Sequence, residues 1–98
     1  MTTVQDIYEA IDSMAPFATA ESWDNSGLLL GRKEKQVQRA MFCLDLTRGA
    51  LTAALRQRAD LVLCHHPVIF RPIGSVTGEA VYYPLLQQDV ALIAAHTN

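Results

Sequence analysis

Residues 59–67 read Ala-Asp-Leu-Val-Leu-Cys-His-His-Pro, and this stretch decides the fold. Its centre, residues 61–64, is an uninterrupted apolar run with the length of a short buried strand. A continuous run without polar alternation is typical of a parallel strand that is covered on both faces. Pro67 disfavours helix at the residue before it, so we expect the chain to leave this strand without entering a helix.

The segment before this stretch combines a strand pattern with a helix pattern. Residues 37–46 are strand-like and end in Leu-Asp-Leu. Thr47 can then cap a helix that continues through residue 58. One face of this helix carries apolar side chains at helical spacing, namely Leu51, Ala54 and Leu55.

The segment after this stretch repeats the pattern. Residues 78–88 fit a second helix, provided that Pro84 kinks it or lies in its first turn. Residues 90–95 are a third apolar run. The order strand, helix, strand, helix, strand predicts an α/β fold, with a mostly parallel sheet and right-handed crossover helices.

The N-terminal part of the chain predicts one more helix and one more strand. Thr3 can cap a helix, with Asp6 three residues later in a capping box, and Pro16 marks the end of the helix. Residues 27–31 predict a brief strand that is followed by a polar turn. The apolar residues of the helix recur at helical spacing: Val4, Ile7, Tyr8, Ile11 and Met14.

The length of 98 residues allows one domain with a modest core. The last apolar run, residues 90–95, ends three residues before the end of the chain. A final buried strand needs neighbouring elements that cover it. We therefore expect residues 1–98 to be a single incomplete α/β domain, the N-terminal portion of a longer protein.

The composition is that of an ordinary globular domain, with 50% hydrophobic and 18% charged residues. A net charge of -2 and dispersed basic residues argue against binding to nucleic acid or to a membrane surface. Acidic residues in the first turns argue against a secretory signal, and no apolar run approaches the roughly 20 residues that span a bilayer. Cys43 and Cys64 lie in apolar runs without CxxC spacing, so we expect reduced thiols in a cytoplasmic protein.

Four side chains that can bind metals lie just beyond the predicted ends of the three parallel strands: Asp45, His65, His66 and His96. Sites in open α/β sheets form at the carboxyl ends of the strands. Imidazole suits zinc, iron, nickel or copper, and carboxylate suits harder ions such as manganese. We therefore predict that His65 and His66 are metal ligands.

The adjacent histidines have a geometric consequence. Successive side chains of an extended backbone point to opposite sides, so His65 and His66 are better placed to hold two different ions than to chelate one. A pair of ions activates water and polarises a substrate oxygen, which is hydrolytic chemistry.

Structural roles are the alternative for each of these residues. Two neighbouring histidines also arise by chance, and Asp45 by itself is more readily explained as a helix-capping or structural residue than as a ligand. His96 is open between a ligand, a hydrogen-bond donor to a ligand and a substrate contact.

A tryptophan followed by two turn-forming residues precedes the first strand. We expect Asp24 and Asn25 to fix a buried turn rather than to act chemically, with Trp23 as a structural side chain. Gly27 and Gly31 flank the predicted strand without the spacing of a phosphate-binding loop.

Four stretches together resemble one family. They are Trp-Asp-Asn-Ser-Gly at 23–27, Leu-Asp-Leu-Thr at 44–47, the stretch at 59–67, and His-Thr-Asn at 96–98. Their order and spacing are similar to those of the Nif-three-like proteins, also called GTP cyclohydrolase 1 type 2 homologues. The resemblance extends from the first helix to the last residue.

The resemblance implies one lobe of a two-lobed α/β fold, a ring-shaped homohexamer, and two divalent ions per subunit (zinc, iron or manganese) that face an internal cavity. It makes His65 and His66 metal ligands. The family's next ligand, an aspartate, follows two residues beyond its His-Thr-Asn motif, and a histidine and a glutamate lie near its C-terminus. This chain ends at Asn98, so we expect it to bind metal weakly by itself.

Three functions remain open from the sequence. The first is a metal-dependent hydrolase that acts on a nucleotide or another small molecule, with His96 assisting proton transfer. The second is a non-catalytic metal-binding regulatory scaffold that acts through protein partners. The third is a portion of a protein that is inactive by itself.

Overall fold

The computed structural model describes residues 1–15, 17, 25–69 and 73–95. Helices and strands follow one another in the order α1 (Val4–Met14), β1 (Gly27–Leu30), β2 (Ala40–Cys43), α2 (Arg48–Arg56), β3 (Leu61–Cys64), α3 (Tyr83–Gln87) and β4 (Ala91–Ala94). In this part of the chain the strands form one sheet in the order β1-β4-β3-β2. β2, β3 and β4 are parallel, and β1 is antiparallel to β4. The predicted α/β class with a mostly parallel sheet is confirmed.

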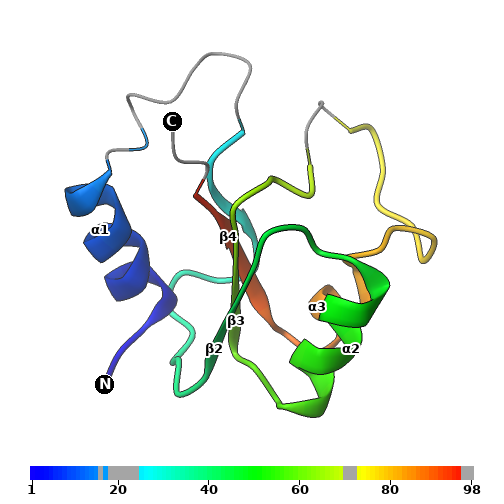
Figure 1. Cartoon of the computed structure of the whole chain (residues 1–98), viewed down its shortest axis with the longest axis horizontal. Coiled ribbons are helices and arrows are strands. Elements are labelled where there is room, and N and C mark those ends of the chain that lie inside the picture. The colour runs from blue at the N-terminus through cyan, green and yellow to red at the C-terminus, as the bar shows by residue number, and fades with distance from the viewer. Residues whose placement is uncertain (16, 18–24, 70–72, 96–98) are drawn as a thin grey trace.

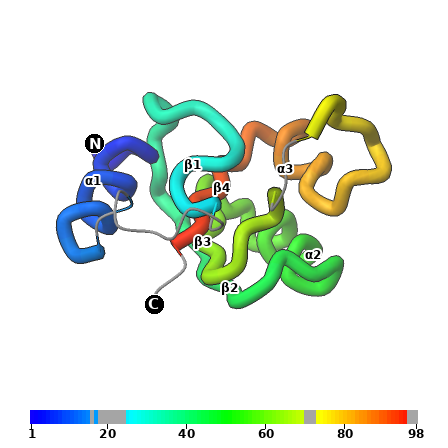
Figure 2. The backbone as a smooth tube through the Cα atoms, turned by 90° about the horizontal axis from the view of Figure 1, so that it is seen from above, coloured from blue at the N-terminus to red at the C-terminus, as the bar shows by residue number. Residues whose placement is uncertain are grey.

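The sheet lies between two helical layers, with α1 on one face and α2 and α3 on the other (Figures 1 and 2). Alternate residues of each strand face opposite layers, so a buried strand contributes to both. The core on the α1 side consists of Val4, Leu61, Ala91 and Ile93. The larger core on the other side includes Leu51, Ala54, Val62, Leu85 and Leu92. β4, which is covered on both faces, is buried along its whole length.

Two threonines begin helices as the sequence predicts. The Thr3 hydroxyl accepts a hydrogen bond from the Asp6 amide at 3.2 Å, and the Asp6 carboxylate accepts one from the Thr3 amide at 2.9 Å. This capping box satisfies amides that α1 leaves without partners. The Thr47 hydroxyl caps α2 in the same way, through the Ala50 amide at 3.1 Å. The expected end of α1 at Pro16 falls on a residue that is not described.

Two elements are shorter than the sequence predicts by more than two residues. The helix expected over 78–88 begins only at Tyr83, with Pro84 in its first turn, where a missing amide hydrogen costs nothing. The strand expected over 37–46 is restricted to Ala40–Cys43. Its predicted start is wrong because the amides of Gln38 and Arg39 donate to the side chain of Asp60 instead of to a neighbouring strand.

β2 is an edge strand with one open face. The side chains of Phe42 and Leu44 are exposed, whereas Met41 packs on the α2 side of the sheet. Coverage on both faces, expected for the parallel strands, therefore holds for β3 and β4 but not for β2. Among the described residues, no helix is long and apolar enough to pass through a membrane.

Gly31 allows a close approach between the end of β1 and the start of β4. Its φ is +99°, in a region that side-chain-bearing residues rarely adopt. A Cβ atom built at this position lies 2.8 Å from the Cα of Ala91, which is backbone of a fully buried strand. Ala91 cannot move away without disturbing the core.

We predict that Gly31→Ala lowers the free energy of unfolding by about 2–4 kcal/mol, because it adds both backbone strain and a steric clash. Urea denaturation measures this loss. Gly74→Ala is the matched control, since an added Cβ at Gly74 meets no atom within 4 Å. Equal stability of the two variants would contradict the close packing of Gly31 on β4.

Candidate metal centre

His65 and His66 lie where β3 ends, at the carboxyl edge of the sheet. The His65 amide donates to the Cys43 carbonyl at 3.1 Å, and the His66 amide donates to the Leu44 carbonyl at 2.9 Å. Pairing with the neighbouring chain segment therefore continues for two residues beyond the strand. On the other side, the Ala95 amide donates to the Cys64 carbonyl at 2.8 Å. These hydrogen bonds fix the backbone that carries both imidazoles.

The two imidazole rings are in contact. Their centroids are 4.8 Å apart and their planes are inclined by 77°, an edge-to-face arrangement. The expectation that the two side chains point to opposite sides is wrong here, because the chain bends at these two residues instead of staying extended. His65 is half-buried and His66 is exposed. The two rings thus lie close enough to face neighbouring cations, or a single one.

Asp45 pairs with His66. Its carboxylate oxygen Oδ1 lies 2.8 Å from the Nδ1 atom of His66. A carboxylate only accepts hydrogen bonds, so the contact assigns the proton to Nδ1 and the lone pair of neutral His66 to Nε2. Ligand histidines in metal sites commonly donate one ring nitrogen to a carboxylate in this way. Asp45 does not cap α2, because Thr47 does; its carboxylate contacts His66 instead.

Two cysteines lie beneath this edge of the sheet. The Sγ atoms of Cys43 and Cys64 are 3.2 Å apart across the neighbouring strands. Cys64 is buried as predicted, and Cys43 is half-buried. Burial, and then the hydrogen bond with Cys43, raises the pKa of the Cys64 thiol. Cys64 belongs to the hydrophobic core on the α2 side and Cys43 packs against it, so imidazole and carboxylate are the more accessible donors of this region.

The donors fit a metal only in part. No three side chains of histidine, cysteine, aspartate or glutamate come together within the described ranges in a way that could hold an ion. Two imidazoles are half of a tetrahedral ligand set. His96, Trp23 and Asp24 lie outside the described residues, so their predicted roles are not addressed by the structure. Asn25 is described, and its side-chain amide donates to the carbonyl of Ile69.

Sequence reasoning did not pair Asp45 with His66. The signal for this pair is the strand register, in which Cys43 lies beside Cys64. Residues one and two positions beyond these cysteines must then meet at the same edge of the sheet. Register between strands that are 21 residues apart is not visible from local sequence patterns.

Comparison with known proteins identifies the class. A family model described as Duf34/NIF3 (NGG1p interacting factor 3) matches residues 2–98. The chain belongs to this family, which confirms the resemblance inferred from its motifs.

Individual relatives are similar over nearly the whole chain. It is 36% identical over 98 residues to a Staphylococcus aureus (strain COL) protein named GTP cyclohydrolase 1 type 2 homolog. It is also 36% identical over 105 residues to a Helicobacter pylori (strain J99) protein named GTP cyclohydrolase 1 type 2. These matches cover 97% and 100% of this chain but only 27% and 41% of the relatives. The chain thus spans less than half the length of each.

A solved structure supports the fold. The crystal structure of Staphylococcus aureus protein SA1388 superposes with a TM-score of 0.91 at 34% sequence identity. The match covers 97% of this chain and 32% of that protein.

We predict that Asp45→Ala moves the proton of neutral His66 from Nδ1 towards Nε2, the usual preference of an imidazole without a carboxylate partner. Long-range ¹H–¹⁵N NMR spectra of the imidazole nitrogens report the tautomer. Glu79→Ala, which removes an exposed carboxylate elsewhere, leaves the His66 spectrum unchanged. An unaltered tautomer in Asp45→Ala would show that Asp45 does not orient the ring.

Proposed function

We propose that this protein binds divalent metal ions through His65 and His66, as part of a dinuclear hydrolase. The observation that carries the proposal is the contact of the two imidazoles, 4.8 Å between centroids, at the carboxyl edge of a parallel sheet. This edge is where open α/β folds form their sites. The partly exposed position of both rings is compatible with access for ions and substrate.

The residues of this chain have distinct parts in the proposed site. His66 binds through Nε2, because its Nδ1 atom, 2.8 Å from Asp45 Oδ1, donates its proton to that carboxylate. His65 supplies the second imidazole, and the hydrogen bonds from both backbone amides keep the pair in place. His96, the other histidine predicted at this edge, assists proton transfer in the proposal. Two zinc, iron or manganese ions held here would activate water and polarise a substrate oxygen.

The proposal places the other ligands in the part of the relatives' length that this chain does not span. In the proposal, the same part forms the second lobe of the fold. The complete protein is proposed to assemble as a hexameric ring. The name of the Helicobacter pylori relative, GTP cyclohydrolase 1 type 2, supports a nucleotide or a related heterocycle as the substrate. Hydrolysis of such a ring is chemistry that a pair of cations serves well.

The family's description favours a second candidate function. It names an interacting factor of another protein, NGG1p. A metal-binding scaffold that acts through protein partners needs the same histidines, but it needs no substrate. Turnover therefore distinguishes the two functions.

We predict that the metal-loaded protein at its full natural length hydrolyses GTP or a generic phosphoester, and that His65→Ala lowers kcat/KM by at least about a hundredfold. Gln57→Ala, at the opposite edge of the sheet, is the control and keeps full activity. Absence of turnover over a broad substrate panel, with metal bound, would favour the scaffold.

A further inference from the structure

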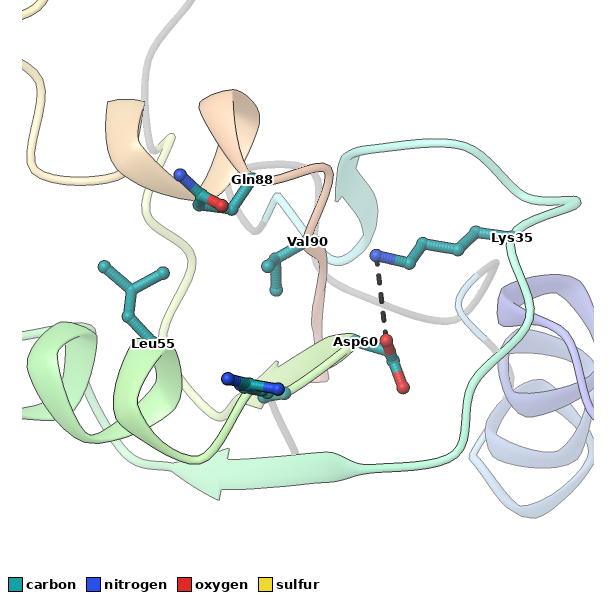
Figure 3. A pocket seen from close by; sticks show the side chains of 7 residues that line it. Lys35, Leu55, Asp60, Gln88 and Val90 are labelled. Atoms are coloured by element: carbon teal, nitrogen blue, oxygen red, sulfur yellow. Dashed lines mark ion pairs between the residues drawn. The ribbon is translucent and has the colours of Figure 1, made fainter.

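A hollow lies at the amino-terminal edge of the sheet, opposite the candidate metal centre. It has a volume of about 400 Å³, and the side chains that matter in its lining are Lys35, Leu55, Arg58, Asp60, Gln88 and Val90 (Figure 3). A neighbouring hollow of about 300 Å³ shares Arg58 and Asp60 with it and adds Arg39. Four strand residues separate this edge from His65, a length of about 13 Å. It is therefore distinct from the candidate metal centre.

The single carboxylate of the pocket is already engaged. Asp60 Oδ2 accepts the amides of Gln38 at 2.9 Å and Arg39 at 3.1 Å, and Oδ1 lies 3.8 Å from the ammonium of Lys35 (Figure 3). Partial burial alone would raise the pKa of Asp60, but the two amides, Lys35 and Arg39 together lower it. Asp60 therefore stays ionised and balances the charge of Lys35. Lys35 also donates to the carbonyl of Asp89.

Unlike the charge of Lys35, the charge of Arg58 is not balanced by a carboxylate among the described residues. Within the described part of the chain, its guanidinium forms no hydrogen bond and no ion pair, and it borders both hollows. Asp89 follows the C-cap of α3 as Arg58 follows that of α2, but its carboxylate does not balance Arg58, because it is paired with Arg32 at 2.6 Å. Arg39, the third cation near the pocket, donates to the carbonyl of Gln57 at 2.9 Å. Three cations and one carboxylate leave the two hollows with a net positive charge.

The backbone at Arg58 is also unusual. Arg58 comes directly after Gln57, the C-cap of α2, and has a φ of 55°, a left-handed conformation that helix ends normally give to glycine. An arginine is less favourable than glycine in this backbone conformation. It places a long cationic side chain in the lining of the pocket. Leu55 and the buried Val90 provide an apolar wall beside it.

We propose that this pocket binds a small organic oxyanion, a carboxylate or a phosphate monoester, through Arg58. The guanidinium offers paired donors that match the oxygens of either group. A short apolar portion of the ligand packs against Leu55 and Val90, and the Gln88 amide is available to polar atoms. The site goes beyond the proposed function, and it does not depend on metal binding at the opposite edge.

The test is an NMR titration of the chain with four probes: butyrate, butyl phosphate, inorganic phosphate and butylamine. We expect saturable shifts of the Lys35, Arg58 and Gln88 amides with the anions, and none with butylamine. Stronger binding of butyrate or of butyl phosphate tells which oxyanion is preferred. Non-saturable shifts, or equal shifts with butylamine, would overturn the proposal.

Arg58→Gly removes the guanidinium at a position whose backbone favours glycine, so the variant keeps its fold. We expect it to weaken anion binding by about tenfold, the effect of one lost charge-assisted contact. Arg56→Gln is the matched control, because Arg56 is an arginine only two residues before Arg58 but lines neither hollow. Anion affinity in Arg58→Gly within twofold of the original chain, or an equal loss in Arg56→Gln, would refute the site.

Discussion

Parallel pairing in register joins β2, β3 and β4, with Cys43 beside Cys64 and Cys64 beside Ala94. Because parallel strands run in one direction, their carboxyl ends share one edge of the sheet and their amino ends share the other. The register brings Asp45 to His66 at the first edge and Arg39 to Asp60 at the second. A slip of one residue would separate both pairs and turn buried side chains outward.

Burial of the central strands makes this register firm. Leu61 and Val62 of β3 and Leu92 and Ile93 of β4 are fully buried between the two helical layers. Residues that directly precede or follow such strands are anchored by backbone that the core holds in place, which reduces the cost of ordering a site. The residues of both proposed sites lie at the two edges, where the chain leaves the apolar interior. The proposed metal centre at one edge and the proposed anion pocket at the other both depend on this packing.

Local patterns predicted the elements whose causes are local. The caps at Thr3 and Thr47 and the apolar run of β3 each depend on residues within one helical turn or one strand. The shorter β2 depends instead on Asp60, some twenty residues away. The contact between the imidazoles depends on a bend at His65 and His66, which the local sequence did not predict. The pocket at Arg58 also stayed hidden, because it unites side chains from segments that only the folded sheet brings together.

A zinc titration of the 98-residue chain, followed by calorimetry and by NMR of the imidazole nitrogens, tests most directly whether the two histidines form a metal centre. We predict weak binding in which the signals of His65 and His66 shift together, since two imidazoles leave an ion under-coordinated. Zinc that binds while both imidazole signals stay unchanged would contradict the centre itself. Tight, stoichiometric binding of two ions would contradict the prediction that this chain provides only part of the ligand set.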